Sequence, residues 1–227
     1  QFIEPEVLNA ALDQLTGLGF QVHLHTIGDR AVRLALDAIE HAIGVHGRHD
    51  LRHHLAHVQV VHPDDLPRFR ALDAVANCQA LWAQADAQMD ELTVPFLGQE
   101  RVDQMYPFGS LARSGTVLAM GSDWPVSTAD PLQQMEVAVT RVGADDRSAA
   151  PFLPGEALTL AEALAGFTSG SAYVNNDEAD SGTLEVGKRA DLVVIDRDLF
   201  APDAGPIGEA KVELTVAAGR VVHDTLA

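Results

Sequence analysis

FQVHLHTIGDRAVRLALDAIEHAIGVHG at residues 20–47, followed by LAHVQVV at residues 55–61, has the pattern of a strand, a helix and a second strand. The first six of these residues read as a strand. Residues 31–43 then carry apolar side chains at helical spacing, and Gly44 and Gly47 end the helix. A helix of this length between two strands is typical of a parallel β-α-β unit.

The same alternation continues on both sides of this unit. Further helices are expected at residues 5–15, from residue 62 onwards, near 99–105, at 107–113 and at 130–142, and further strands at 75–81 and 116–120. About four β-α units of this kind predict an α/β fold with a parallel sheet.

The chain changes character near residues 176–182, a polar run that we take as a domain boundary. Two short helices, at residues 160–165 and around 169–173, are expected before it, and strands at 190–195, 212–216 and 221–223 after it, with a hairpin turn at 217–220. The sequence therefore predicts one unit at residues 1–176 and a β-rich unit at residues 177–227.

Composition and charge exclude several classes of protein. The 227 residues are 47% hydrophobic and carry 15 basic against 33 acidic side chains, a formal net charge of −18. Such a chain is globular, and it lacks the basic surface that nucleic acid and anionic membranes require. No apolar run approaches the ~18 residues of a membrane helix. We therefore expect a small-molecule partner, with neither nucleic acid nor membrane bound.

The ends and the cysteine usage suggest a compartment and a longer protein. Cys78 is the single cysteine, so a disulfide within the chain and a cysteine-based zinc site are both excluded. No signal peptide is visible, and a cytoplasmic location is expected. The chain starts at Gln1 without an initiator methionine, so we expect it to begin partway along a gene.

Three polar residues lie at or just after the ends of the expected strands. They are His25, His57 and Asp123. The carboxyl ends of parallel strands point to one face of a sheet or barrel, where sites are built. Two imidazoles and a carboxylate at that face have the ligand chemistry of zinc or a related divalent ion. A single histidine at a strand end is more often structural, and Asp123 alone reads equally well as a turn cap; the three together predict a metal site.

These residues belong to a series of motifs that resembles one family. In order along the chain stand HTIGDRA (25–31), HVQ (57–59), YPF (106–108), GSDWPV (121–126), TSGSAY (168–173) and GTLEVGKRAD (182–191). The series resembles metal-dependent amidohydrolases, in the branch of amidohydrolase family three that contains N-substituted formamide deformylases. The resemblance spans residues 1 to 224 and implies the C-terminal half of a (β/α)8 TIM-type barrel, strands five to eight, plus the C-terminal strands of a small β-sandwich.

The resemblance also implies an activity and the residues that perform it. The family hydrolyses carbon–nitrogen bonds other than peptide bonds, with water activated by zinc or another divalent metal, one or two ions in a complete site. His25, His57 and Asp123 match the metal ligands of strands five, six and eight, and Asp123 also matches the catalytic base. Gln59 and Trp124, beside these ligands, are candidates to bind an amide substrate. Packing around the barrel mouth is an equal alternative for both.

Two features of the superfamily have no match here. Its members carry Asp-x-His-x-His on strand one, and many carry a bridging lysine on strand four, whereas the two lysines of this chain, Lys188 and Lys211, lie in the β-rich part. The alternative is therefore an inactive fragment that is stable only as a homodimer or with its missing N-terminal half. His23 shares a strand face with His25 and is a further candidate ligand.

Other polar residues near these motifs are expected to be structural. His53 and His54, at the start of a strand, are expected to be solvated. Asp29 and Arg30 are expected to form an ion pair with each other or to cap the following helix.

Overall fold

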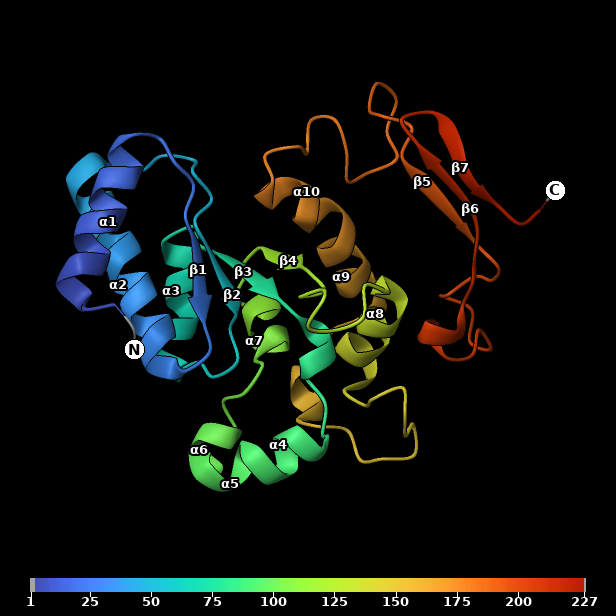
Figure 1. Cartoon of the computed structure of the whole chain (residues 1–227), viewed down its shortest axis with the longest axis horizontal. Coiled ribbons are helices and arrows are strands. Elements are labelled where there is room, and N and C mark those ends of the chain that lie inside the picture. The colour runs from blue at the N-terminus through green and yellow to red at the C-terminus, as the bar shows by residue number, and fades with distance from the viewer. Residues whose placement is uncertain (1–2, 227) are drawn as a thin grey trace.

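A parallel four-stranded sheet forms the centre of the computed structural model, which describes residues 3–226 (Figure 1). Its strands are β1 (His23–Thr26), β2 (His54–His57), β3 (Val75–Cys78) and β4 (Leu118–Met120), in the spatial order β1-β2-β3-β4. In the register of the first pair, His25 lies opposite Ala56 and Thr26 opposite His57. The predicted parallel sheet of four strands is confirmed.

Helices connect these strands and cover the sheet. They are α1 (Pro5–Gly17) before β1, α2 (Asp29–His46) after it, α3 (Leu66–Ala71) after β2, and α7 (Phe108–Arg113) before β4. Helix α2 buries the apolar stripe of Val32, Leu36 and Ile39, which faces the core. In Figure 1, α1 and α2 pack together beside β1.

The segment between β3 and α7 departs from the expected pattern. The strand expected to reach Leu81 ends at Cys78, and a 3-10 helix (Ala80–Trp82) follows it. Three short helices come next: α4 (Ala87–Leu92), α5 (Val94–Leu97) and α6 (Gln99–Val102). They form a lobe that projects from the sheet at the bottom of Figure 1. We call residues 80–102 the β3–α7 insertion.

The C-terminal part contains three further α-helices and a second sheet. The helices are α8 (Pro131–Thr140), α9 (Leu160–Ala165) and α10 (Ser171–Val174), with a π-helical turn at Gly166–Gly170 between the last two. The sheet is antiparallel, with β5 (Leu192–Ile195), β6 (Val212–Ala217) and β7 (Arg220–Asp224) in that order. The expected hairpin turn between β6 and β7 is confirmed, with Ala218 and Gly219 at positive φ.

Residues 1–176 and residues 177–227 are linked by buried and partly buried contacts. The Glu136 carboxylate of α8 is 4% exposed; it binds the Arg147 guanidinium and accepts the backbone N–H of Gly208 at 2.6 Å. Arg52, before β2, makes two hydrogen bonds to the Glu178 carboxylate, which follows α10. Ala210 belongs to the same buried cluster as the residues around the parallel sheet.

Both outer strands of the parallel sheet have one neighbour. Within residues 3–226, β1 pairs only with β2, and β4 pairs only with β3. A strand edge of this kind presents unpaired N–H and C=O groups. The arrangement is an open α/β sheet, and its identity as half of a barrel stays a prediction. Across the same residues no helix has the length and apolar character needed to cross a membrane.

The expectation that His53 and His54 are solvated is wrong, because both are only 8% exposed. The His53 imidazole lies between two elements: its Nδ1 accepts the Val22 N–H at 3.1 Å, and its Nε2 is 3.2 Å from the Thr16 hydroxyl. The His54 Nδ1 is 3.2 Å from the Arg52 carbonyl oxygen. These histidines bind the start of β2 to its surroundings, and burial lowers the pKa of both.

Because His53 is buried, we expect the folded protein to lose stability in mild acid. Since Nδ1 accepts a hydrogen bond, the folded chain holds this imidazole neutral, and its pKa lies below the ordinary 6.5. Below that pH the unfolded chain takes up a proton that the folded chain does not, so falling pH favours unfolding. We expect this group to lower the unfolding free energy by up to about 1.4 kcal/mol per pH unit.

Urea unfolding at pH 7.5, 6.5 and 5.5 measures this slope in wild type and in His53→Gln. The variant should show the shallower dependence on pH. The control is His41→Gln, since His41 is an exposed histidine on α2. Equal slopes in wild type and His53→Gln would contradict the expectation.

Candidate metal centre

Two imidazoles meet at the carboxyl ends of adjacent strands. His25 of β1 and His57, the last residue of β2, have ring centroids 4.4 Å apart in an edge-to-face arrangement. One layer lower, His23 and His54 form a second pair with centroids 4.7 Å apart. Alternate residues of a strand point to one face, so His23 and His25 share a face of β1. His57 lies three residues after His54 and opposite Thr26, and it reaches the His25 ring where the backbone turns out of the strand, with φ at 70°.

The backbone at His57 leaves the strand in a strained conformation. His57 and Val58 have φ angles of 70° and 53°, in the left-handed region that β-branched residues rarely adopt. The His57 N–H donates to Gln79 Oε1 at 2.8 Å, and Gln79 Nε2 donates to Asn77 Oδ1 at 2.8 Å. Side chains from β3 and just after it therefore hold the turn that places the His57 imidazole.

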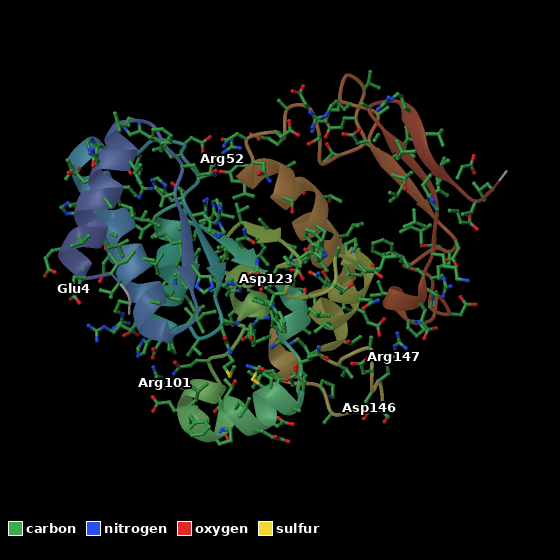
Figure 2. The ribbon with its side chains drawn as sticks, in the orientation of Figure 1. Glu4, Arg52, Arg101, Asp123, Asp146 and Arg147 are labelled. Atoms are coloured by element: carbon green, nitrogen blue, oxygen red, sulfur yellow. The ribbon has the colours of Figure 1, made fainter. Side chains whose placement is uncertain are left out.

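Asp123 is held in the loop after β4, near the middle of the molecule (Figure 2). Its φ is 57°, and its carbonyl oxygen accepts the N–H groups of Val126 at 2.8 Å and Ser127 at 3.2 Å. The loop is thus a turn closed on Asp123 itself. Its carboxylate is near enough to His57 to oppose the lowering of that residue's pKa.

The pKa of His57 lies below its ordinary value. Burial is the main cause and the neighbouring His25 adds to it, while the Asp123 carboxylate acts in the opposite direction. The His57 imidazole is consequently neutral at neutral pH. A neutral imidazole has the free lone pair with which histidine binds metals.

His25, His57 and Asp123 line one pocket of about 450 Å³, together with Gln59. The rest of its lining consists of Ile27, Trp82, Asp86, Gln88, Met89, Thr93, Tyr106 and Val126. The other candidate, Trp124, is absent from this lining and is 69% exposed. Sequence reasoning singled out Gln59 but missed the residues of the β3–α7 insertion, because no motif or periodicity there indicated a pocket.

The donor types in the pocket fit a divalent metal, but the arrangement is incomplete. Throughout residues 3–226, no three His, Cys, Asp or Glu side chains are grouped so that they could hold one ion. The structure brings the His25 and His57 imidazoles together and places Asp123 in the same pocket, without joining the three as a ligand set. The assignment of these three residues, and of His23, as ligands stays a prediction.

The prediction of an ion pair between Asp29 and Arg30 is wrong. Asp29 instead binds Arg101 of α6, which donates from Nε to Oδ2 at 3.0 Å and makes a second, shorter contact. The helix is capped by Gly28, and Asp29 occupies its first turn. The hydrogen bond from Arg101 is the main reason that the pKa of Asp29 is lowered. This contact fixes the β3–α7 insertion against the start of α2.

Several known proteins are similar to this chain in sequence. Residues 1–223 match the amidohydrolase family. The protein LONG AFTER FAR-RED 3 of Arabidopsis thaliana is 31% identical over 227 residues, covering 98% of this chain and 37% of that protein. The N-substituted formamide deformylase of Arthrobacter pascens is 29% identical over 205 residues, covering 89% of this chain and 36% of the relative.

A solved structure agrees with the same grouping. An uncharacterized metal-dependent hydrolase from Pyrococcus horikoshii superposes with a TM-score of 0.76 at 29% identity, covering 92% of this chain and 40% of the hydrolase. This chain thus spans about two fifths of the length of these relatives. The match over residues 1–223 is sufficient to assign the family: the chain belongs to the amidohydrolase family, in the branch of amidohydrolase family three.

Proposed function

We propose that this protein is a metal-dependent hydrolase that cleaves a non-peptide carbon–nitrogen bond of an amide or formamide. The observation that carries the proposal is the His25–His57 imidazole pair, which lies at the ends of parallel strands in a pocket that Asp123 also lines. The formamide deformylase named above is similar along 89% of this chain, which supports a substrate of that class.

Each residue has a role in the proposed reaction. His25, His57 and Asp123 would hold zinc or another divalent ion, one or two in the complete site. Such an ion lowers the pKa of water to about 7 and polarises the scissile carbonyl. Asp123 takes a proton from the attacking water and returns it to the leaving amine, a step worth about 10²–10⁴-fold. Gln59, which lines the pocket, orients the amide, and Trp124, which follows Asp123 in the sequence, is the second candidate to contact the substrate.

A second reading is that this chain alone is inactive. The absence of a three-residue ligand group within residues 3–226 favours it, as do the single-neighbour edges of β1 and β4. In this reading, the open edges pair with a second copy of the chain or with an additional barrel segment of a longer protein. That partner would complete both the sheet and the ligand set.

Metal content and hydrolysis together test the proposal. The purified chain is incubated with Zn²⁺ and desalted; its metal is measured by plasma mass spectrometry, and release of formate from N-propylformamide is followed. We expect one or two ions per chain, and activity that a chelator removes and Zn²⁺ restores. A folded chain without metal and without activity would support the second reading, and light scattering then reports whether it self-associates.

A further inference from the structure

We propose that Asp86 and Tyr106 form a subsite for an ammonium group inside the same pocket, so that the enzyme prefers amides whose substituent is positively charged. This inference rests on the proposed hydrolase function and specifies its substrate class. It concerns residues to which neither the metal nor the proton transfer assigns a role.

The charge of the pocket favours a cation. Among its lining residues within the described chain, none is lysine or arginine, whereas Asp86 and Asp123 are both carboxylates. Asp123 is assigned to the metal, which leaves Asp86 as the carboxylate available to substrate. The net charge of −18 adds an attractive field for cations and a repulsive one for anions.

One oxygen of the Asp86 carboxylate is held by a hydrogen bond, and the other is available to a ligand. It precedes α4, and its Oδ1 accepts the Met89 N–H at 2.7 Å, as a helix N-cap does. Its Oδ2 has no hydrogen-bond partner among residues 3–226. Capping alone would explain a carboxylate here, but asparagine caps equally well, so the charge itself can be tested separately.

Tyr106 supplies a second, independent polar group. Its side chain is 4% exposed and lines the pocket, yet its hydroxyl makes no hydrogen bond to another residue of the described chain. The backbone of Tyr106 is fixed, because its N–H donates to the Gln59 carbonyl at 2.7 Å and its carbonyl accepts from Arg141 Nη1 at 3.2 Å. The hydroxyl oxygen is not enclosed by protein, so a ligand in the pocket can bond to it.

The two groups match the chemistry of an ammonium ion. Burial is the main cause that raises the pKa of the Tyr106 phenol; the Arg141 guanidinium opposes it and the Asp86 carboxylate adds to it, and the phenol stays neutral. The phenol oxygen accepts one ammonium N–H, and Asp86 Oδ2 accepts another. Trp82 lines the same pocket, and an aromatic ring adds cation–π attraction.

Three formamides of similar size measure the preference. They are N-(2-aminoethyl)formamide, N-propylformamide and N-formylglycine, which are cationic, neutral and anionic at pH 7. We expect kcat/KM for the cation to exceed that for the neutral compound by about tenfold, with the anion lowest. In Asp86→Asn the ratio of cation to neutral compound should fall to about one, and Tyr106→Phe should lower it about threefold.

Binding provides a readout that does not need catalysis. Calorimetry compares 2-phenylethylammonium with 2-phenylethanol, which differ mainly in charge, and we expect about tenfold tighter binding of the ammonium ion, lost in Asp86→Asn. Two controls are available: Asp90→Asn removes an exposed charge from the same helix, and Asp130→Asn changes another capping aspartate outside the pocket. Both should keep the wild-type ratio.

The outcomes separate this inference from the proposed function. If all three formamides are hydrolysed without a charge preference, or if Asp90→Asn changes the ratio as much as Asp86→Asn does, the subsite is refuted and the hydrolase stands. If no formamide is hydrolysed, the proposed function fails. The calorimetric comparison then decides the subsite alone, and equal affinities for the two phenylethyl compounds overturn it.

Discussion

His57→Asn is expected to lower the affinity for zinc by at least about a hundredfold and to remove the metal-dependent hydrolysis. Loss of a residue that merely supports a metal ligand costs about 10–100-fold, and His57 is proposed as a ligand itself. Asparagine is the informative replacement because it tolerates the left-handed backbone that His57 adopts, with φ at 70°. The variant thus tests the imidazole without adding strain to the turn.

Three measurements accompany this substitution. Zinc affinity is titrated against a competing chelator, kcat/KM is measured with a formamide, and circular dichroism checks the fold. His41→Asn, on the exposed side of α2, is the matched control and should behave as wild type. A His57→Asn protein that is folded, binds zinc normally and retains hydrolysis would remove His57 from the metal site.

Gly170→Ala is expected to cost about 3 kcal/mol of unfolding free energy or more. A methyl group on Gly170 would lie 2.0 Å from the carbonyl oxygen of Leu118 and 3.3 Å from that of Ala165. Both atoms belong to the backbone, the first to β4 and the second to α9, so neither can move away as a flexible side chain could. The π-helical turn would have to lift from the sheet.

Gly44→Ala is the matched control for this substitution. Gly44 lies inside α2, and a methyl group added there would have no atom within 4 Å. Alanine favours helix by up to about 1 kcal/mol over glycine, so this variant should be slightly more stable than wild type. Urea unfolding of both variants gives the comparison, and a Gly170→Ala protein as stable as wild type would refute the close packing of this turn on β4.

The sequence predicted which strands exist better than it predicted where they end. The apolar runs at residues 55–61 and 75–81 both predicted strands, and both strands exist, but β2 stops at His57 and β3 at Cys78. Hydrophobic patterning records which residues are buried. It does not record where the chain leaves the sheet. The exit of β2 depends on a positive φ at His57, whose N–H is held by the side chain of Gln79, just after β3.

Part of the candidate site could also be predicted from the sequence. Strand ends located His25, His57 and Asp123, and the structure places all three along one pocket with Gln59. Asp86 could not be found, since its approach to the pocket depends on how the β3–α7 insertion folds back. The Arg101–Asp29 contact that secures this lobe joins residues 72 positions apart, which no local pattern reveals.

Two kinds of chain segment line the pocket: the strands of the sheet, and the β3–α7 insertion that the Arg101–Asp29 contact anchors. The His25 and His57 imidazoles lie on strands whose register is shared by the whole sheet, so a shift of their backbone would disturb the scaffold. Trp82, Asp86 and Met89 come from the β3–α7 insertion, which lines the pocket but supplies none of the proposed metal ligands. We therefore expect substitutions in this stretch to change which ligands the pocket accepts while the proposed metal ligands stay the same, which makes the stretch the natural unit to exchange when a new selectivity is sought.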